Sequence, residues 1–147
     1  MIAEIDFAAM TPSKLAIVMP AAWQVIKTQL SLLDVERENC SIIVGQRDQN
    51  VIEVHAAVAV PNQQRGKNAF SIAASDWRKV EYLSSWPLLG CFHTHGASAT
   101  ASASDRRSIR RSGMFFLIGS ARSGKGLQLQ GFLAEGSTIS TWEVRLK

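Results

Sequence analysis

The stretch that decides the fold runs from Leu88 to Asp105 and reads Leu-Leu-Gly-Cys-Phe-His-Thr-His-Gly-Ala-Ser-Ala-Thr-Ala-Ser-Ala-Ser-Asp. Its first eight residues predict a β-strand, in which successive side chains point to opposite faces. His93 and His95 therefore share one face, roughly 7 Å apart along the backbone, close enough for two imidazoles to bind one metal ion. The same alternation predicts that Leu89 and Cys91 lie on that face too.

Asp105 follows His95 after a loop of small residues, and we expect it to cap a short helix that runs to about Ser112. Such a loop can bend back and offer the carboxylate as a third ligand. Two imidazoles and one carboxylate suit Zn²⁺ and leave the fourth tetrahedral position for water. A histidine pair on a strand followed by an acid also occurs without any metal, as two partly buried structural histidines.

Catalysis at such a zinc needs a carboxylate that is not a ligand, to accept a proton from water and deliver it to the leaving amine. Glu38 is our candidate for this base. Composition alone leaves three competitors open: Glu36, Glu53 and Glu81.

Three segments together resemble the signature of the JAMM (MPN+) zinc metallopeptidases. They are Glu38-Asn-Cys-Ser-Ile-Ile-Val-Gly45, His93-Thr-His95 and Ser102-Ala-Ser-Asp105. The family pattern is a glutamate in an E-x-C-G-L-L-x-G-like segment, then H-[ST]-H-P, then S-x-x-D. The likeness extends to Asn62, Phe70-Ser-Ile and Leu89-Gly-Cys-Phe, covers most of the chain, and is typical of a stand-alone prokaryotic member.

The resemblance implies a role for each residue of the signature. His93, His95 and Asp105 would hold one Zn²⁺ per chain, and Glu38 would be the general base and proton shuttle for the zinc-bound water. Ser102 would donate a hydrogen bond to the water or to the tetrahedral oxyanion.

Three departures from the family pattern bear on the site. Gly96 stands where the family usually has proline, and Ser41 replaces a frequent glycine. Nine residues separate His95 from Asp105, where ten are usual, so the missing residue falls within positions 97–101. A distorted loop would weaken zinc binding and displace Ser102.

We expect one JAMM/MPN+ domain over residues 1–147. The mixture of helices and consecutive strands predicts an α+β, α-β-α layered domain. The resemblance implies a curved mixed β-sheet flanked by helices, the cytidine-deaminase-like MPN fold. The expected strands are Leu15–Val18, Ser41–Val44, Val51–Val60, Leu88–His95, Phe115–Ile118, Leu127–Leu133 and Ile139–Arg145, with helices beginning at Pro20, at Ala74 or Ser75, and at Asp105.

The family resemblance also implies an activity. Such enzymes are metalloproteases that cleave peptide or isopeptide bonds after the C-terminal tail of ubiquitin or ubiquitin-like proteins. Prokaryotic members act on ubiquitin-like or sulfur-carrier proteins, some within antiviral conjugation systems that include E1-like and E2-like proteins. The expected partner here is such a protein with a glycine-rich tail. The alternatives are a catalytically silent MPN scaffold and a processing peptidase for a sulfur-carrier protein.

Composition narrows the classes of protein further. The net charge of +4 and the pI of 9.4 favour acidic partners only weakly and do not predict nucleic-acid binding. No apolar run approaches the ~20 residues of a membrane span, and the acidic N-terminus does not resemble a signal peptide. Two cysteines without a CxxC motif are typical of a cytoplasmic protein, and we expect that location.

Two further motifs point elsewhere and are given less weight. The pairs Arg106–Arg107 and Arg110–Arg111 form a basic helix face, which we interpret first as a solvated face and second as a substrate-binding patch centred on Arg106 and Arg110. Gly119–Gly126 resembles a phosphate-binding loop, but alternating residues follow it, so we expect a hairpin turn rather than a nucleotide site.

Overall fold

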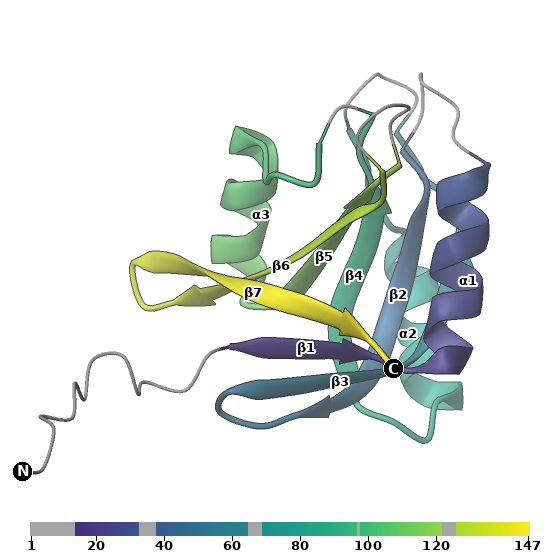
Figure 1. The fold of residues 1–147 in the computed structure, drawn as a ribbon. Helices are drawn as coiled ribbons and strands as arrows, with labels where there is room; N and C mark the ends of the chain where they lie inside the picture. Colours follow the sequence, from purple (N-terminus) through teal and green to yellow (C-terminus); the bar gives the residue numbers. More distant parts are fainter. Residues whose placement is uncertain (1–13, 33–37, 65–68, 97, 122–125) are drawn as a thin grey trace, which may run out of the picture.

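The structure is a computed structural model that describes residues 14–32, 38–64, 69–96, 98–121 and 126–147. Its strands are β1 (Leu15–Val18), β2 (Cys40–Arg47), β3 (Val51–Val60), β4 (Leu88–Thr94), β5 (Phe115–Ser120), β6 (Gln128–Glu135) and β7 (Thr138–Leu146). Its helices are α1 (Pro20–Ser31), α2 (Ala74–Leu83) and α3 (Ala103–Ser112), arranged as in Figure 1. The predicted elements are therefore all present, with most bounds within one or two residues.

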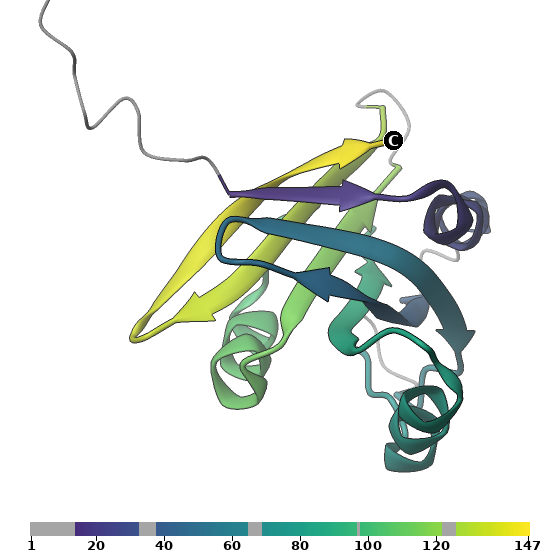
Figure 2. The ribbon, with the colours of Figure 1, turned by 90° about the horizontal axis from the view of Figure 1, so that it is seen from below.

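The strands form one mixed sheet that closes into a barrel in the order β1-β3-β2-β4-β5-β6-β7. β1 runs parallel to both β3 and β7, and β4 runs parallel to β5; the other neighbours are antiparallel. Figure 2 looks across this ring of strands from below. The α+β class with a mixed, curved sheet is confirmed, whereas its closure was not predicted.

The helices cover different faces of the sheet. α1 packs Ile26 and Leu30 into a cluster with Ile43 of β2 and Phe92 of β4. The neighbouring strand residues point to the opposite face. Ile42 belongs to a cluster with Val80 of α2, and Cys91 belongs to a cluster with Ile109 of α3. This alternation is what a strand buried on both faces requires. It places α2 and α3 on the same face as His93.

A bulge in β4 overturns one sequence prediction. Ile43 pairs with Gly90 but Val44 pairs with Leu88, so the register shifts at this point. Leu89 consequently packs with Phe92 in the α1 cluster, not with Cys91 on the histidine face. Gly90 permits the close approach of β5 here, because a Cβ on this residue would lie 1.9 Å from the carbonyl oxygen of Phe115.

One strand is longer than expected. The strand predicted over Ser41–Val44 continues to Arg47, so only Asp48–Asn50 separate β2 from β3. Leu32 and Leu83 are 67% and 68% exposed. Both lie at helix ends, where the chain is already leaving the sheet. None of the helices in the described ranges has the length and apolar character to cross a bilayer.

Candidate metal centre

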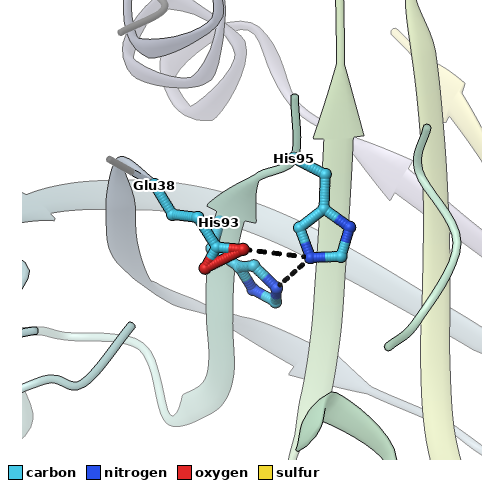
Figure 3. Close-up of side chains that lie close together, drawn as sticks. All are labelled: Glu38, His93 and His95. Atoms are coloured by element: carbon cyan, nitrogen blue, oxygen red, sulfur yellow. Dashed lines mark hydrogen bonds and ion pairs between the residues drawn. The ribbon is translucent and has the colours of Figure 1, made fainter. Parts of the chain in front are cut away.

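The end of β4 places the two histidines together. His93 is completely buried on this strand, and its ring stacks on Phe70 with centroids 4.1 Å apart. His95 follows the last strand residue, and its backbone N–H donates to the carbonyl of Gly119 in β5 at 2.8 Å. The Nε2 atoms of the two imidazoles are 3.1 Å apart. Figure 3 shows the two rings turned toward each other.

α3 places Asp105 against both imidazoles. One carboxylate oxygen lies 3.1 Å from His93 Nε2 and the other lies 3.1 Å from His95 Nε2. The shorter loop therefore does not keep Asp105 away from the histidines. The prediction that Asp105 caps the helix is wrong. Asp105 is the third residue of α3, and Ser102 is the N-cap residue. From this third position the carboxylate faces the two histidines and also reaches back to the backbone N–H of Ser102.

Ser102 and Asp105 form a reciprocal capping box. The Asp105 backbone N–H donates to Ser102 Oγ at 3.0 Å, and the Ser102 backbone N–H donates to the Asp105 carboxylate at 2.9 Å. These bonds satisfy two of the N–H groups that a helix start leaves without partners. They also orient the carboxylate before any ligand binds.

Glu38 reaches the cluster from the segment that leads into β2. Its carboxylate oxygen lies 3.3 Å from His95 Nε2, and the side chain is 7% exposed. Ligand atoms of Glu38, His93 and His95 all lie within 4.8 Å of one another. Of the competing glutamates, Glu53 lies beside His55, Glu81 is exposed on α2, and residue 36 lies outside the described ranges.

The strand that carries the histidines also holds the segment that carries Glu38. Asn39 donates its backbone N–H to Thr94 Oγ1 at 2.9 Å, and Thr94 donates its own N–H to the Asn39 carbonyl at 2.9 Å. Thr94 lies between the two histidines, so this pair of bonds sets the separation of Glu38 from them. Gln29 of α1 supports the same segment by donating to the Cys40 carbonyl at 2.8 Å.

Burial and the charges of neighbouring groups shift the pKa values of the four side chains in different directions. Burial raises the pKa of Glu38 to about 7; the charge of His95 opposes this rise, and the charge of Asp105 adds a smaller increase. Burial lowers the pKa of His93. For His95 burial acts downward, but the hydrogen bond and charge of Asp105 outweigh it and raise the pKa. Burial would raise the pKa of Asp105, yet its bonds to both imidazoles hold the pKa far below the usual value.

Several supporting residues were not predicted from the sequence. Thr94 and Phe70 act through contacts between segments distant in the chain, which no local pattern reveals. Gln29 left a detectable signal, because it is a polar residue among the apolar positions of α1 and is buried there. A buried polar side chain in an apolar helix face has to find a hydrogen-bond partner.

The remaining sequence motifs lie apart from this cluster. Burial raises the pKa of the Cys91 thiol, which keeps it protonated and therefore a poor nucleophile. β5 and β6 form an antiparallel hairpin where the phosphate-loop pattern stands, although residues 122–125 lie outside the described ranges. Arg106, which follows Asp105 in the chain, and Arg110 are both exposed on α3.

The fold and the histidine–carboxylate cluster define a JAB-like domain with a possible metal site. The family model for prokaryotic homologs of the JAB domain matches residues 21–130 of the chain. The protein therefore belongs to this prokaryotic JAB/MPN family.

Among solved structures, the chain resembles the solution structure of a protein from Desulfitobacterium hafniense. The two share 21% sequence identity with a TM-score of 0.74, over 90% of this chain and 92% of that one. At this identity the likeness concerns the fold alone. No curated protein is significantly similar to the chain.

Proposed function

We propose that this protein is a zinc-dependent peptidase of the JAMM type that cleaves the bond after the C-terminal tail of a ubiquitin-like or sulfur-carrier protein. One observation carries the proposal: two imidazoles and two carboxylates from three separate segments converge on one small volume. A structural histidine pair does not require a second, largely buried carboxylate whose pKa is raised to about 7.

The donor set fits a zinc ion. The Nε2 atoms of His93 and His95 face each other at 3.1 Å, and Asp105 contacts both. A carboxylate and two converging imidazoles are ligands that zinc prefers, and a cation between them removes the repulsion of their lone pairs. His93, His95 and Asp105 would hold one zinc per chain. Bound there, zinc supplies a Lewis acid that polarises the scissile carbonyl and makes water a nucleophile near neutral pH.

Glu38 would carry the proton. Its Oε2 atom is buried and has no hydrogen-bond partner among the described residues, so one carboxylate oxygen remains available. With a pKa near 7, the carboxylate can accept a proton from the attacking water and return it to the departing lysine or α-amine. Ser102 would donate its hydroxyl hydrogen to the developing oxyanion, since Oγ only accepts a bond in the capping box.

A hollow beside Glu38 supports an extended glycine-rich tail as the substrate. It has a volume of about 370 Å³ and lies between the Glu38 segment and the end of β3. Its lining includes Glu38, Asn39, Val60, Pro61 and Asn62. Glycines would fit such a hollow without side chains that have to displace its lining.

The basic face of α3 would help to recruit the carrier protein. Arg106, Arg107, Arg110 and Arg111 are exposed, and none has an ion-pair partner among the described residues. Such a face attracts an acidic surface and raises the association rate more than the final affinity. Reversing Arg106 and Arg110 to glutamate should lower kcat/KM for the whole carrier at low salt; an unchanged kcat/KM would leave this face merely solvated.

The experiment that tests the function uses a ubiquitin-like fusion whose tail is followed by a short reporter. The zinc-loaded protein is expected to release the reporter, and Glu38→Gln should retain zinc while cleavage falls by about 10²–10⁴-fold. His95→Ala should lose both zinc and cleavage. A wild-type protein that binds no zinc, or that binds zinc without cleaving any tail, would instead support a silent MPN scaffold.

A further inference from the structure

The side chain of Asn62 joins the segment of Glu38 to the segment of Phe70. Its amide nitrogen donates to the carbonyl of Glu38 at 2.9 Å and to the carbonyl of Ala69 at 3.0 Å. Its amide oxygen accepts from the backbone N–H of Gln64 at 3.0 Å and of Ser71 at 3.1 Å. One side chain thus bonds to four backbone groups.

Only asparagine satisfies this arrangement. The four bonds use both amide hydrogens and both lone pairs of the amide oxygen. An aspartate would place a charged oxygen against two carbonyl oxygens, and an alanine would leave all four backbone groups without these partners. A glutamine is one methylene too long to keep both pairs aligned.

Each end of this connection lies against a different part of the metal centre. Glu38 carries the carboxylate that contacts His95, and the Asn62 bond holds the backbone carbonyl of that same residue. Ala69 and Ser71 flank Phe70, whose ring stacks on His93. Phe70 also contacts Phe116 edge-on, which fixes the ring from a second side.

We propose that Asn62 is a positioning residue of the active site, which sets the Glu38 carboxylate relative to the imidazoles while it holds Phe70 against His93. The inference deepens the proposed function and rests on it. Asn62 and Thr94 hold the peptide group that joins Glu38 to Asn39: Asn62 donates to its carbonyl oxygen, and Thr94 Oγ1 accepts from its N–H. Without Asn62, Glu38 would keep one attachment and lose the second.

The decisive test is a double-mutant cycle between Asn62 and Glu38 on the tail-reporter fusion. Asn62→Asp should lower kcat by about 10- to 100-fold, the usual effect of losing a partner that orients a site residue, with KM and zinc content unchanged. In single-turnover reactions, the same substitution in a Glu38→Gln background should cause no further loss. Equal losses in both backgrounds would overturn the inference, because Asn62 would then act independently of Glu38.

A matched control and a second readout separate this inference from the proposed function. Gln63→Ala removes the exposed side chain of the neighbouring residue and should leave kcat unchanged. The bond of Gln63 to Ser71 is made by its backbone N–H and is kept in this variant. Hydrogen exchange needs no substrate: in Asn62→Asp the Asn39 N–H should exchange about tenfold faster than in Gln63→Ala. If the wild type cleaves nothing, the proposed function fails, and unchanged exchange at Asn39 would then overturn the positioning role as well.

Discussion

α2 and α3 are similar helices with different consequences. Each has ten residues, each covers the same face of the sheet, and each has an aspartate at its third position, Asp76 in α2 and Asp105 in α3. α3 begins with a serine that forms a capping box, whereas α2 begins after Ala73, which offers no side-chain cap. Among the described residues, the Asp76 side chain makes no hydrogen bond or ion pair.

The comparison shows what fixes a ligand at a helix start. Asp105 is held by Ser102 in the chain before it and by the two imidazoles, while Ile109 anchors the helix in the core one turn later. The loop before α3 therefore only has to reach the cap. This explains how a loop one residue shorter than the family's usual length still delivers the carboxylate.

The largest expected effect concerns Asp105 itself. Asp105→Asn should lower zinc affinity by more than about 100-fold, beyond the loss caused by removing a partner of a ligand, because a neutral amide is a poor third ligand. Competition with a chromophoric chelator measures this affinity. Asp76→Asn, at the matched position of α2, should change it by less than about twofold; equal losses would contradict the assignment.

Zinc binding should release protons, and α2 should contribute none of them. The pKa of Glu38 is about 7 and that of His95 is raised, so near pH 6 the metal-free protein holds protons on both groups. A dication favours the ionised carboxylate and the neutral imidazole, so both protons leave. Glu38 should contribute to the protons released at pH 6, because its raised pKa lies above that pH. Calorimetry in buffers of different ionisation enthalpy counts them, and Glu38→Gln should reduce the count whereas Asp76→Asn should not.

Exchanging the caps should move stability in opposite directions. Ser102→Ala should destabilise the protein by about 1 kcal/mol, and Ala73→Ser should stabilise it by a similar amount, because Ala73 already has the extended backbone of a cap residue. Urea denaturation of the metal-free variants measures both changes. Only Ser102→Ala should also weaken zinc binding, and a loss of zinc in Ala73→Ser would show that the two helices are coupled.

The smallest effect is expected from the loop. One alanine inserted between Thr100 and Ala101 should change zinc affinity by less than about threefold, since lengthening a loop costs little and the cap still orients Asp105. The same insertion between Ala103 and Ser104 breaks the spacing of the capping box. It should therefore reduce zinc affinity about as strongly as Asp105→Asn. Equal sensitivity at both points would show that the loop, not the cap, positions the ligand.

The sequence predicted the elements well because their signals are local. Alternation located the strand with His93 and His95, and helical spacing located α1 and α2. Leu89 was misplaced because a bulge shifts the strand by one residue, and alternation contains no sign of it. Closure of the barrel also escaped prediction, since the pairing of β1 with β7 depends on twist accumulated over the whole sheet.

Some residues of the candidate site could likewise be predicted from the sequence, and others could not. The histidines and Asp105 follow from spacing and residue chemistry, but Glu38 could be separated from the other glutamates only by the family resemblance. The structure now places Glu38 alone among the described glutamates beside His95. The role of Asn62 was out of reach, because its four partners come together only in the folded chain.

The seam of the barrel has a consequence for the order of assembly. β1 pairs with β7 over Leu15–Val18 and Glu143–Leu146, so the ring of strands cannot be sealed during synthesis until β7 has emerged. The elements that bear Glu38, the histidines and Asp105 are complete well before, by the end of β5. The nascent chain can thus build the half that bears the histidine–carboxylate cluster early, while one edge of β1 waits unpaired and open to other strands.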